Sequence, residues 1–316
     1  MIPNTAMRPT RDGYVEGLLA AGERSPRVVV LDGDVGRSTG VIAFGDRFPD
    51  RYWNLGIAEQ NIAGHAAGLA LEGFIPFYST YAVFAVGRAL DQIRTAVCGM
   101  GLPVRIGGAH GGTSVGPDGG THQALEDIAQ TRALPGMTVL VPADANQTRE
   151  AVLASLEIPG PVYIRYGRNP VPSIYGEGSR IAPGKGNLLR EGRDLAIVAC
   201  GAMVGAALEA AEVLHGMGIE ASVIDMVSVK PLDESLLMEV TGGVQGVVTA
   251  EDHQAAGGLG GAVAEFLAEN RPLPMRILGV PDRFGESGDP GELLGQYMLS
   301  SHGISRAAID LMRPRK

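Results

Sequence analysis

The chain has 316 residues, which exceeds one ordinary hydrophobic core and predicts two domains. Lys and Arg total 26 against 35 Asp and Glu, and the resulting net charge of −9 argues against nucleic acid or an anionic membrane surface as a partner. Two cysteines are too few for a disulfide framework, and the N-terminal residues lack a signal-peptide core, so we expect a cytoplasmic protein.

Apolar strands, glycine-rich loops and helices alternate through the first half of the chain. We expect strands over 28–31, 74–78, 104–106, 138–141 and 162–166, and helices over 57–71, 82–97 and 144–156. The apolar stretch 68–87 approaches membrane-spanning length, but Glu72 and Pro76 interrupt it, so we expect a helix end followed by a strand. Strands separated by helices predict a mostly parallel, doubly wound α/β sheet.

A second unit follows a segment rich in Pro and Gly. Residues 169–188 have no helical period and predict a linker that runs along a surface. The rhythm then restarts, with strands over 195–199, 221–225, 246–250 and 275–278 and helices over 204–215, from 233, over 260–268 and over 305–312. We therefore expect two doubly wound α/β domains, 1–180 and a smaller one over 181–316.

Unusual polar residues gather in one loop, GAHGGTSVGPDGGTHQ at 108–123, which follows a strand. Ligands of open α/β sheets bind beyond the carboxyl ends of the strands. His110, Asp118 and His122 could there orient hydroxyl groups and transfer protons near neutral pH. The simpler alternative is a glycine-rich turn with solvent-facing histidines, whereas a zinc site fits poorly because the spacing matches no common ligand pattern.

Two further positions combine charge with a strand or helix end. Glu59 opens a very apolar helix, where an acidic residue either favours the helix dipole or serves as a buried functional carboxylate that needs a partner. Arg165 and Arg168 end a strand and suit a phosphate, sulfonate or carboxylate, although a salt bridge between domains explains them nearly as well. Arg11 and Ser38 are individually uninformative.

Taken together, these segments resemble the C-terminal two-thirds of transketolase, a thiamine diphosphate enzyme, and also 1-deoxyxylulose-5-phosphate synthase. The matching strings are NLGIAEQN, FYSTYAVF, HGGTSVGPDGGTHQ, MTVLVPADANQ and YIRYGRN, in that order. Residues 1 to about 180 resemble the pyrimidine-binding domain and 186–316 the small C-terminal domain. The resemblance implies α/β domains of these two kinds.

The resemblance departs from full-length members at the front of the chain. Those members begin with a domain whose GDG…N motif binds Mg²⁺ and the cofactor diphosphate, and only about ten residues precede the pyrimidine-domain pattern here. This implies the C-terminal subunit of a split transketolase. Its N-terminal subunit would ligate the Mg²⁺, and the two chains would form a heterotetramer.

The resemblance also implies roles for single residues. Glu59 matches the glutamate that hydrogen-bonds N1′ of the aminopyrimidine, and Tyr81 and Phe84 match the aromatic residues that pack on that ring. His122 matches the histidine near the reacting carbon of the cofactor. Asp118 matches the carboxylate that reads a substrate hydroxyl.

His110 and Arg168 match the positions at which the family binds the terminal phosphate of the substrate. Arg11 and Ser38 are weaker matches, by spacing alone. We include Asp34 among the cofactor-binding candidates, although its loop lacks the glycine expected after the second Asp of a metal–diphosphate loop. Many members have a histidine just after the glutamate, where this chain has Gln60 and Asn61.

The implied reaction transfers a two-carbon ketol unit from a ketose phosphate, or a sulfo-sugar or branched-sugar analogue, to an aldose. The alternatives are the synthase, the beta subunit of a 2-oxo acid dehydrogenase and a non-catalytic remnant. His110 stands where synthases generally have an arginine, and the dehydrogenases need not hold a sugar phosphate as Arg168 could. Intact Glu59, Asp118 and His122 argue against a remnant.

Overall fold

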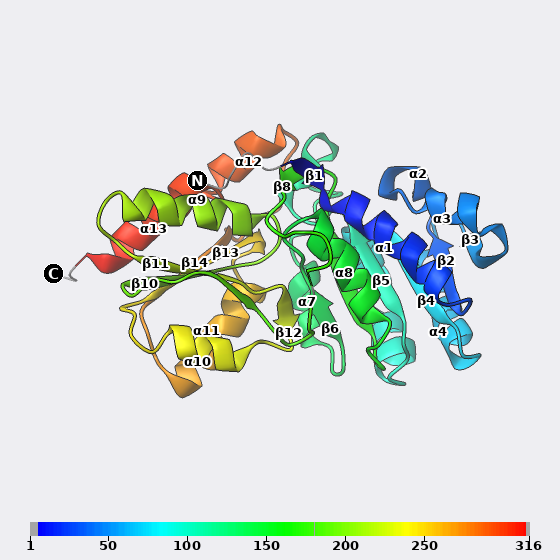
Figure 1. The fold of residues 1–316 in the computed structure, drawn as a ribbon. Helices are drawn as coiled ribbons and strands as arrows, with labels where there is room; N and C mark the ends of the chain where they lie inside the picture. Colours follow the sequence, from blue (N-terminus) through cyan, green and yellow to red (C-terminus); the bar gives the residue numbers. More distant parts are fainter. Residues whose placement is uncertain (1–5, 180, 314–316) are drawn as a thin grey trace.

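Two open sheets with helices on both faces form this protein, a computed structural model that describes residues 6–179 and 181–313 (Figure 1). The first sheet runs in the order β12 (Ser228–Lys230), β6 (Thr138–Leu140), β7 (Val162–Tyr166), β5 (Arg105–Ala109), β4 (Ile75–Tyr81), β2 (Val28–Asp32) and β3 (Tyr52–Asn54). All its pairs are parallel except β12 with β6. The predicted doubly wound fold is confirmed.

Alternating side chains of these strands enter two cores. Val28 and Val30 pack with α1 (Thr10–Arg24), α3 (Ile42–Arg47) and α8 (Ala145–Ser155). Leu31 points to the other face, because successive residues of a strand alternate. That face is covered by α4 (Glu59–Leu71), α5 (Ala82–Gly87), α6 (Leu90–Gln92), the π-helical stretch Ile93–Cys98 and α7 (Asp127–Ala133).

The second sheet follows the same scheme in the order β14 (Met275–Val280), β13 (Val247–Gln254), β10 (Leu195–Ala199), β11 (Ala221–Asp225) and β9 (Asn187–Arg190). Ile197 packs with α9 (Met203–His215) and α13 (Ser301–Met312). Val198 faces α10 (Glu234–Val240) and α11 (Leu259–Asn270), in a core that continues into the first sheet. The chain also contains α2 (Gly36–Thr39), α12 (Pro290–Gln296) and the 3₁₀ turns Pro49–Arg51 and Thr113–Asp118.

The segment between the two units is partly structured. Within 169–188 the chain forms β8 (Pro170–Pro172), which pairs with β1 (Met7–Pro9), and then enters β9. The expected boundary at 180 falls on a residue outside the described ones. Because β12 comes from the second half but joins the first sheet, the two units share a sheet edge as well as a core.

Helix α1 shows a limit of sequence patterns, because we did not expect a helix there. A Cβ on Gly13 would lie 1.8 Å from the carbonyl oxygen of Ala145, and one on Gly17 would lie 2.7 Å from Val152 Cβ. The glycines therefore let α1 and α8 approach closely, at a cost in helix propensity. The same glycines make the segment resemble a loop in the sequence.

Other elements differ from expectation in detail. The helix expected over 82–97 is divided into α5, α6 and the π-helical stretch. The helix expected over 144–156 is α8, and Asp144 caps it, because its carboxylate accepts a hydrogen bond from the backbone N–H of Gln147 at 2.8 Å. The stretch 68–87 does divide into a helix end and a buried strand, and no helix among the described residues is long and apolar enough to cross a membrane.

Candidate functional site

Three rings gather at the carboxyl edge of the first sheet. Tyr81 ends β4, Phe84 lies in α5, and His122 closes the glycine-rich loop that follows β5. The Tyr81 and Phe84 rings are nearly parallel, with centroids 6.1 Å apart, and the His122 ring stands edge-on 5.8 Å from Tyr81 and 5.3 Å from Phe84. The structure thus brings together three residues that lie in two separate sequence motifs.

Glu59 lies beside this cluster as the first residue of α4, with only 2% of its surface exposed. Its Oε2 accepts a hydrogen bond from Nη1 of Arg88 at 3.0 Å. The Arg88 side chain is 48% exposed, and its guanidinium carbon lies 4.0 Å from the centroid of Phe84. A buried carboxylate is therefore satisfied by an arginine that is itself half in solvent.

A second chain of contacts starts from Tyr81. Its hydroxyl and that of Ser38 are 2.8 Å apart, and Ser38 Oγ lies 3.3 Å from Nε2 of His110. His110 is fully buried in a left-handed conformation (φ 55°), and its Nδ1 has no hydrogen-bond partner among the described residues. Burial, helped by the positive charges of Arg168 and Arg11, lowers the pKa of His110 to about 4, so the ring is neutral at pH 7.

The basic residues near His110 are tied to protein groups. Nη2 of Arg168 lies 3.1 Å from Oδ1 of Asp118 and also donates to the carbonyl oxygen of Val115. Nη1 of Arg11 donates to the carbonyl oxygen of Ser38 at 3.1 Å. Both arginine side chains remain partly exposed, which leaves N–H groups for an anionic ligand.

Asp34 lies apart from these two groups. It is exposed, has φ 66°, and its Oδ1 accepts a hydrogen bond from Asn54 at 2.8 Å. The buried Asp32 accepts from the backbone N–H groups of Val35 and Gly36, both at 3.1 Å. This acidic loop is therefore ordered by Asp32, while Asp34 faces outward.

The sequence did not identify Arg88 as a site residue. For Arg165 it left two explanations open, an anion site and a salt bridge between domains. Arg88 stands four residues after Phe84, the helical spacing that brings two side chains together, but nothing in the sequence links it to Glu59. Arg165 forms a salt bridge with Asp127 at 2.8 Å and donates to the carbonyl oxygen of Asp252 at 2.9 Å. Because Asp127 is in the first domain and Asp252 is in β13 of the second, the salt bridge stays within one domain, and Arg165 links the domains through the hydrogen bond instead.

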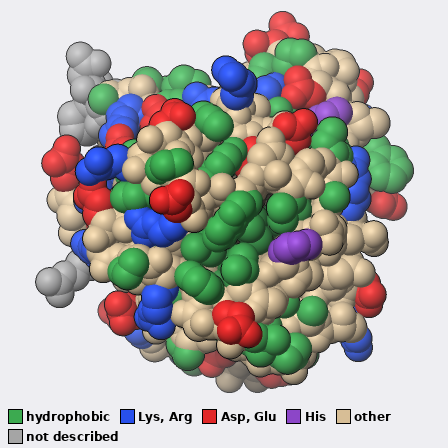
Figure 2. Space-filling model, turned by 90° about the vertical axis from the view of Figure 1, so that its right-hand side faces the viewer, with side chains coloured by type: hydrophobic (Ala, Val, Ile, Leu, Met, Phe, Trp, Pro, Cys, Tyr) green, Lys and Arg blue, Asp and Glu red, His purple; other side chains and the backbone are tan. Residues whose placement is uncertain are grey.

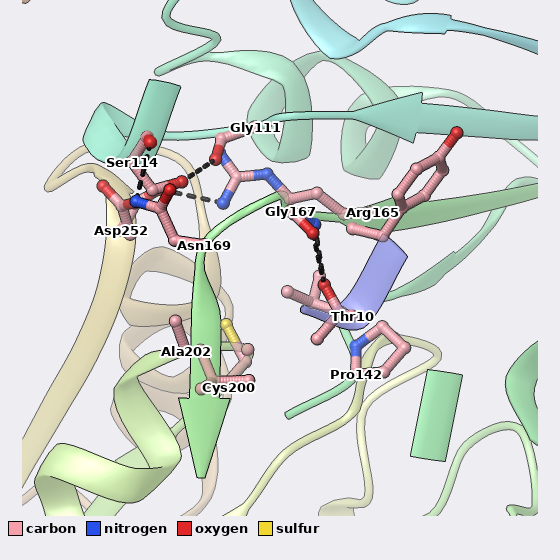
Figure 3. Close-up of a pocket in the computed structure, with 14 residues that line it drawn as sticks. Thr10, Gly111, Ser114, Pro142, Arg165, Gly167, Asn169, Cys200, Ala202 and Asp252 are labelled. Atoms are coloured by element: carbon pink, nitrogen blue, oxygen red, sulfur yellow. Dashed lines mark hydrogen bonds between the residues drawn. The ribbon is translucent and has the colours of Figure 1, made fainter. Parts of the chain in front are cut away.

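A pocket between the two domains contains Arg165, and Figure 3 shows its polar groups bonded to one another. Thr10 Oγ1 accepts a hydrogen bond from the N–H of Gly167 at 2.7 Å, and Asn169 donates to the carbonyl oxygen of Ser114 at 2.8 Å. The predicted site residues do not line this pocket. Nor do the described residues include a group of three or more His, Cys, Asp or Glu that could hold a metal ion.

Comparisons with known proteins agree with this architecture. Residues 6–173 match the model of the transketolase pyrimidine-binding domain, and 184–304 that of the transketolase C-terminal domain. The 6-deoxy-6-sulfo-D-fructose transketolase subunit of a Clostridium species is 43% identical over 94% of this chain and 92% of its own length. One of the apulose-4-phosphate transketolase subunits of Phocaeicola vulgatus is 36% identical over 96% of this chain and 97% of its own length.

A solved structure supports the same assignment. A split-gene transketolase, described as an inactive beta4 tetramer, is 48% identical, with a TM-score of 0.90 over 96% of this chain and 98% of that one. The resemblance found in the sequence motifs is thereby confirmed. This chain belongs to the transketolase family of thiamine diphosphate-dependent transferases, and it comprises a pyrimidine-binding and a C-terminal transketolase domain.

Proposed function

We propose that this chain is one of two subunits that together build a transketolase active site, and that it contributes the aminopyrimidine half. The observation that carries the proposal is the buried carboxylate of Glu59 beside the rings of Tyr81, Phe84 and His122. The enzyme would transfer a two-carbon ketol unit from a ketose donor to an aldose acceptor.

The residues present fit the aminopyrimidine of thiamine diphosphate. The carboxylate of Glu59 lies beside the face of the Phe84 ring. A planar group with N–H donors, the guanidinium of Arg88, contacts both of them. The backbone before α4 is open, because a Cβ on Gly56 would meet no atom within 4 Å. A flat heterocycle that hydrogen-bonds a carboxylate suits such a place.

When bound, the cofactor supplies a nucleophilic carbon for cleaving and forming the bond next to the ketose carbonyl. Glu59 would hold a proton at N1′ of the aminopyrimidine, and Tyr81 and Phe84 would keep water from that ring. His122 would orient the donor hydroxyls and assist proton transfer, and Asp118 would bind a substrate hydroxyl. We also keep Asp34 as a candidate cofactor contact.

The anionic end of the sugar would bind to His110, Arg168, Arg11 and Ser38. Both arginines still have N–H groups free for the ligand, and the neutral His110 ring adds a hydrogen bond without a charge. The names of two relatives include a sulfo-sugar and a sugar phosphate, so we propose a donor that ends in a sulfonate or a phosphate.

The partner would be an N-terminal subunit that binds the cofactor diphosphate and ligates Mg²⁺, in a heterotetramer. Figure 2 shows apolar side chains gathered on the side of the molecule where β3 and α4 lie. Exposed apolar residues in this region are Ile42, Trp53, Ile57 and Leu71. An apolar patch next to an open half-site suits a subunit interface. The cytoplasmic location stays a prediction from the sequence.

Reconstitution tests the proposal. We would co-express this chain with a chain that carries the GDG…N motif and assay cleavage of xylulose 5-phosphate with thiamine diphosphate and Mg²⁺. We expect activity only when both chains are present. A sulfo-sugar donor should be assayed in parallel. Turnover of pyruvate in place of ketoses would indicate the synthase or the dehydrogenase alternative, and activity of this chain alone would refute the two-subunit proposal.

A further inference from the structure

We propose that the guanidinium of Arg88 occupies the aminopyrimidine position in the cofactor-free chain and has to leave it when the cofactor binds. The inference rests on the proposed function, because it takes Glu59 and Phe84 as the groups that receive the aminopyrimidine. It adds a residue that competes with the cofactor from within the chain.

Two independent contacts place Arg88 in this position. Its Nη1 donates to Oε2 of the buried Glu59 at 3.0 Å, and its guanidinium carbon lies 4.0 Å from the centre of the Phe84 ring. A guanidinium is planar, carries N–H donors along its edge and stacks on aromatic faces. An aminopyrimidine shares these three properties. A ring that contacts both Glu59 and Phe84 would therefore occupy the space that the guanidinium of Arg88 fills.

Arg88 is also free to leave. Its side chain is 48% exposed, and among the described residues its hydrogen bond and ion pair are with Glu59 and its ring contact is with Phe84. The preceding Gly87 is exposed, and a Cβ there would meet no atom within 4 Å. The long side chain can therefore turn outward without disturbing a packed core.

The contact with Arg88 explains how the carboxylate of Glu59 can be buried before the cofactor binds. Glu59 is only 2% exposed, and a buried carboxylate without a partner is costly. Arg88 supplies that partner until the cofactor takes over the contact. Removing Arg88 should therefore destabilise the cofactor-free site more than the loaded one, which is equivalent to tighter cofactor binding.

Calorimetric titration of thiamine diphosphate into the complex of this chain with its N-terminal subunit tests the inference. We expect Arg88→Ala to lower the Kd by about three- to tenfold, the range for a partly exposed ion pair with a stacking contact. Arg88→Lys, which keeps the charge but loses the planar fork, should fall between Arg88→Ala and the wild type. Arg94→Ala, at an exposed arginine in the adjacent π-helical stretch, is the matched control and should leave the Kd unchanged.

Inorganic diphosphate provides the second arm. It lacks the aminopyrimidine, so its affinity for the complex should be the same in all four proteins. An unchanged or raised Kd for thiamine diphosphate in Arg88→Ala would overturn the inference, because Arg88 would then remain with Glu59 in the loaded site. If that variant does not fold, Arg88→Lys against the wild type decides in the same way. If the wild-type complex binds no thiamine diphosphate, the proposed function fails, and this inference fails with it.

Discussion

Two arginine–carboxylate pairs in this chain have the same chemistry and opposite surroundings. Arg165 and Asp127 are both buried, and Arg165 reaches Asp127 through Nε at 2.8 Å and Nη2 at 3.1 Å while also donating to two backbone carbonyls. Arg88 gives Glu59 one hydrogen bond and stays half in solvent. The first pair lies inside the first domain, and its arginine also links the two domains through the carbonyl oxygen of Asp252. In the second pair the arginine is partly exposed and makes one hydrogen bond.

If Glu59 has the role we propose, burial of the arginine, rather than the presence of an ion pair, distinguishes a structural pair from one in a ligand site. A fully bonded buried pair cannot exchange a partner for a ligand without leaving a charge unpaired. A carboxylate that is buried while its partner is exposed can do so.

Glu59→Gln should abolish most activity while the fold survives. The amide keeps the size of the side chain but cannot hold a proton at the aminopyrimidine as the carboxylate would. We expect kcat of the reconstituted enzyme to fall by about 10²–10⁴-fold, the usual contribution of a positioned proton-transfer group. Glu72→Gln, the same substitution at an exposed glutamate just after α4, is the matched control and should leave kcat unchanged. Near-normal turnover of Glu59→Gln with added cofactor would refute the role of Glu59.

Asp127→Ala should unfold or strongly destabilise the protein. The substitution leaves the buried guanidinium of Arg165 without its counter-charge and the hydroxyl of Tyr163 without its acceptor. We expect the free energy of unfolding to fall by about 3–5 kcal/mol in a denaturant titration. Asp118→Ala removes the acid of a partly exposed pair and should cost no more than about 1 kcal/mol. Equal losses in the two variants would contradict the distinction.

Arg168→Ala should weaken binding of the anionic donor without affecting the fold. The loss of one charged hydrogen bond should raise KM for xylulose 5-phosphate by about 10- to 100-fold, equivalent to about 1.5–3 kcal/mol. Unphosphorylated xylulose provides the control, since its KM should change little. If the KM for the phosphorylated donor is also unchanged, Arg168 serves only its ion pair with Asp118.

His110 should lower the stability of the folded protein in acid. In the unfolded chain its pKa is near 6.5, whereas burial lowers the folded value to about 4. The unfolded state therefore binds the extra proton first, and stability is lost as the pH falls from about 6.5 to about 4. His110→Asn, which tolerates the left-handed backbone, should remove this contribution.

The readout is the difference between the two stability curves. Buried Glu251 and Asp225, whose pKa values burial raises to about 7 and about 6, act in the opposite direction and are common to both proteins. The wild type should lose stability faster than His110→Asn, by at most about 1.4 kcal/mol per pH unit. Parallel curves would show that His110 does not titrate in this way.

The sequence predicts the fold better than the contacts of the site. Apolar runs such as 195–199 predict buried strands because the signal is local, whereas the glycines of α1 conceal a helix whose purpose is close packing. The motifs around Glu59 and His122 identify the candidate site, but the structure alone joins Glu59 to Arg88. That contact spans 29 positions and the Arg165–Asp127 pair spans 38, distances over which one sequence carries no pairing signal.

We propose that this chain provides only half of a cofactor site. Calorimetric titration of thiamine diphosphate, with Mg²⁺ present, into this chain alone, the N-terminal subunit alone and the complex of the two tests it most directly. We expect tight binding to the complex, with one cofactor per pair of chains, and much weaker binding to either chain alone. Tight, stoichiometric binding to this chain by itself would contradict it.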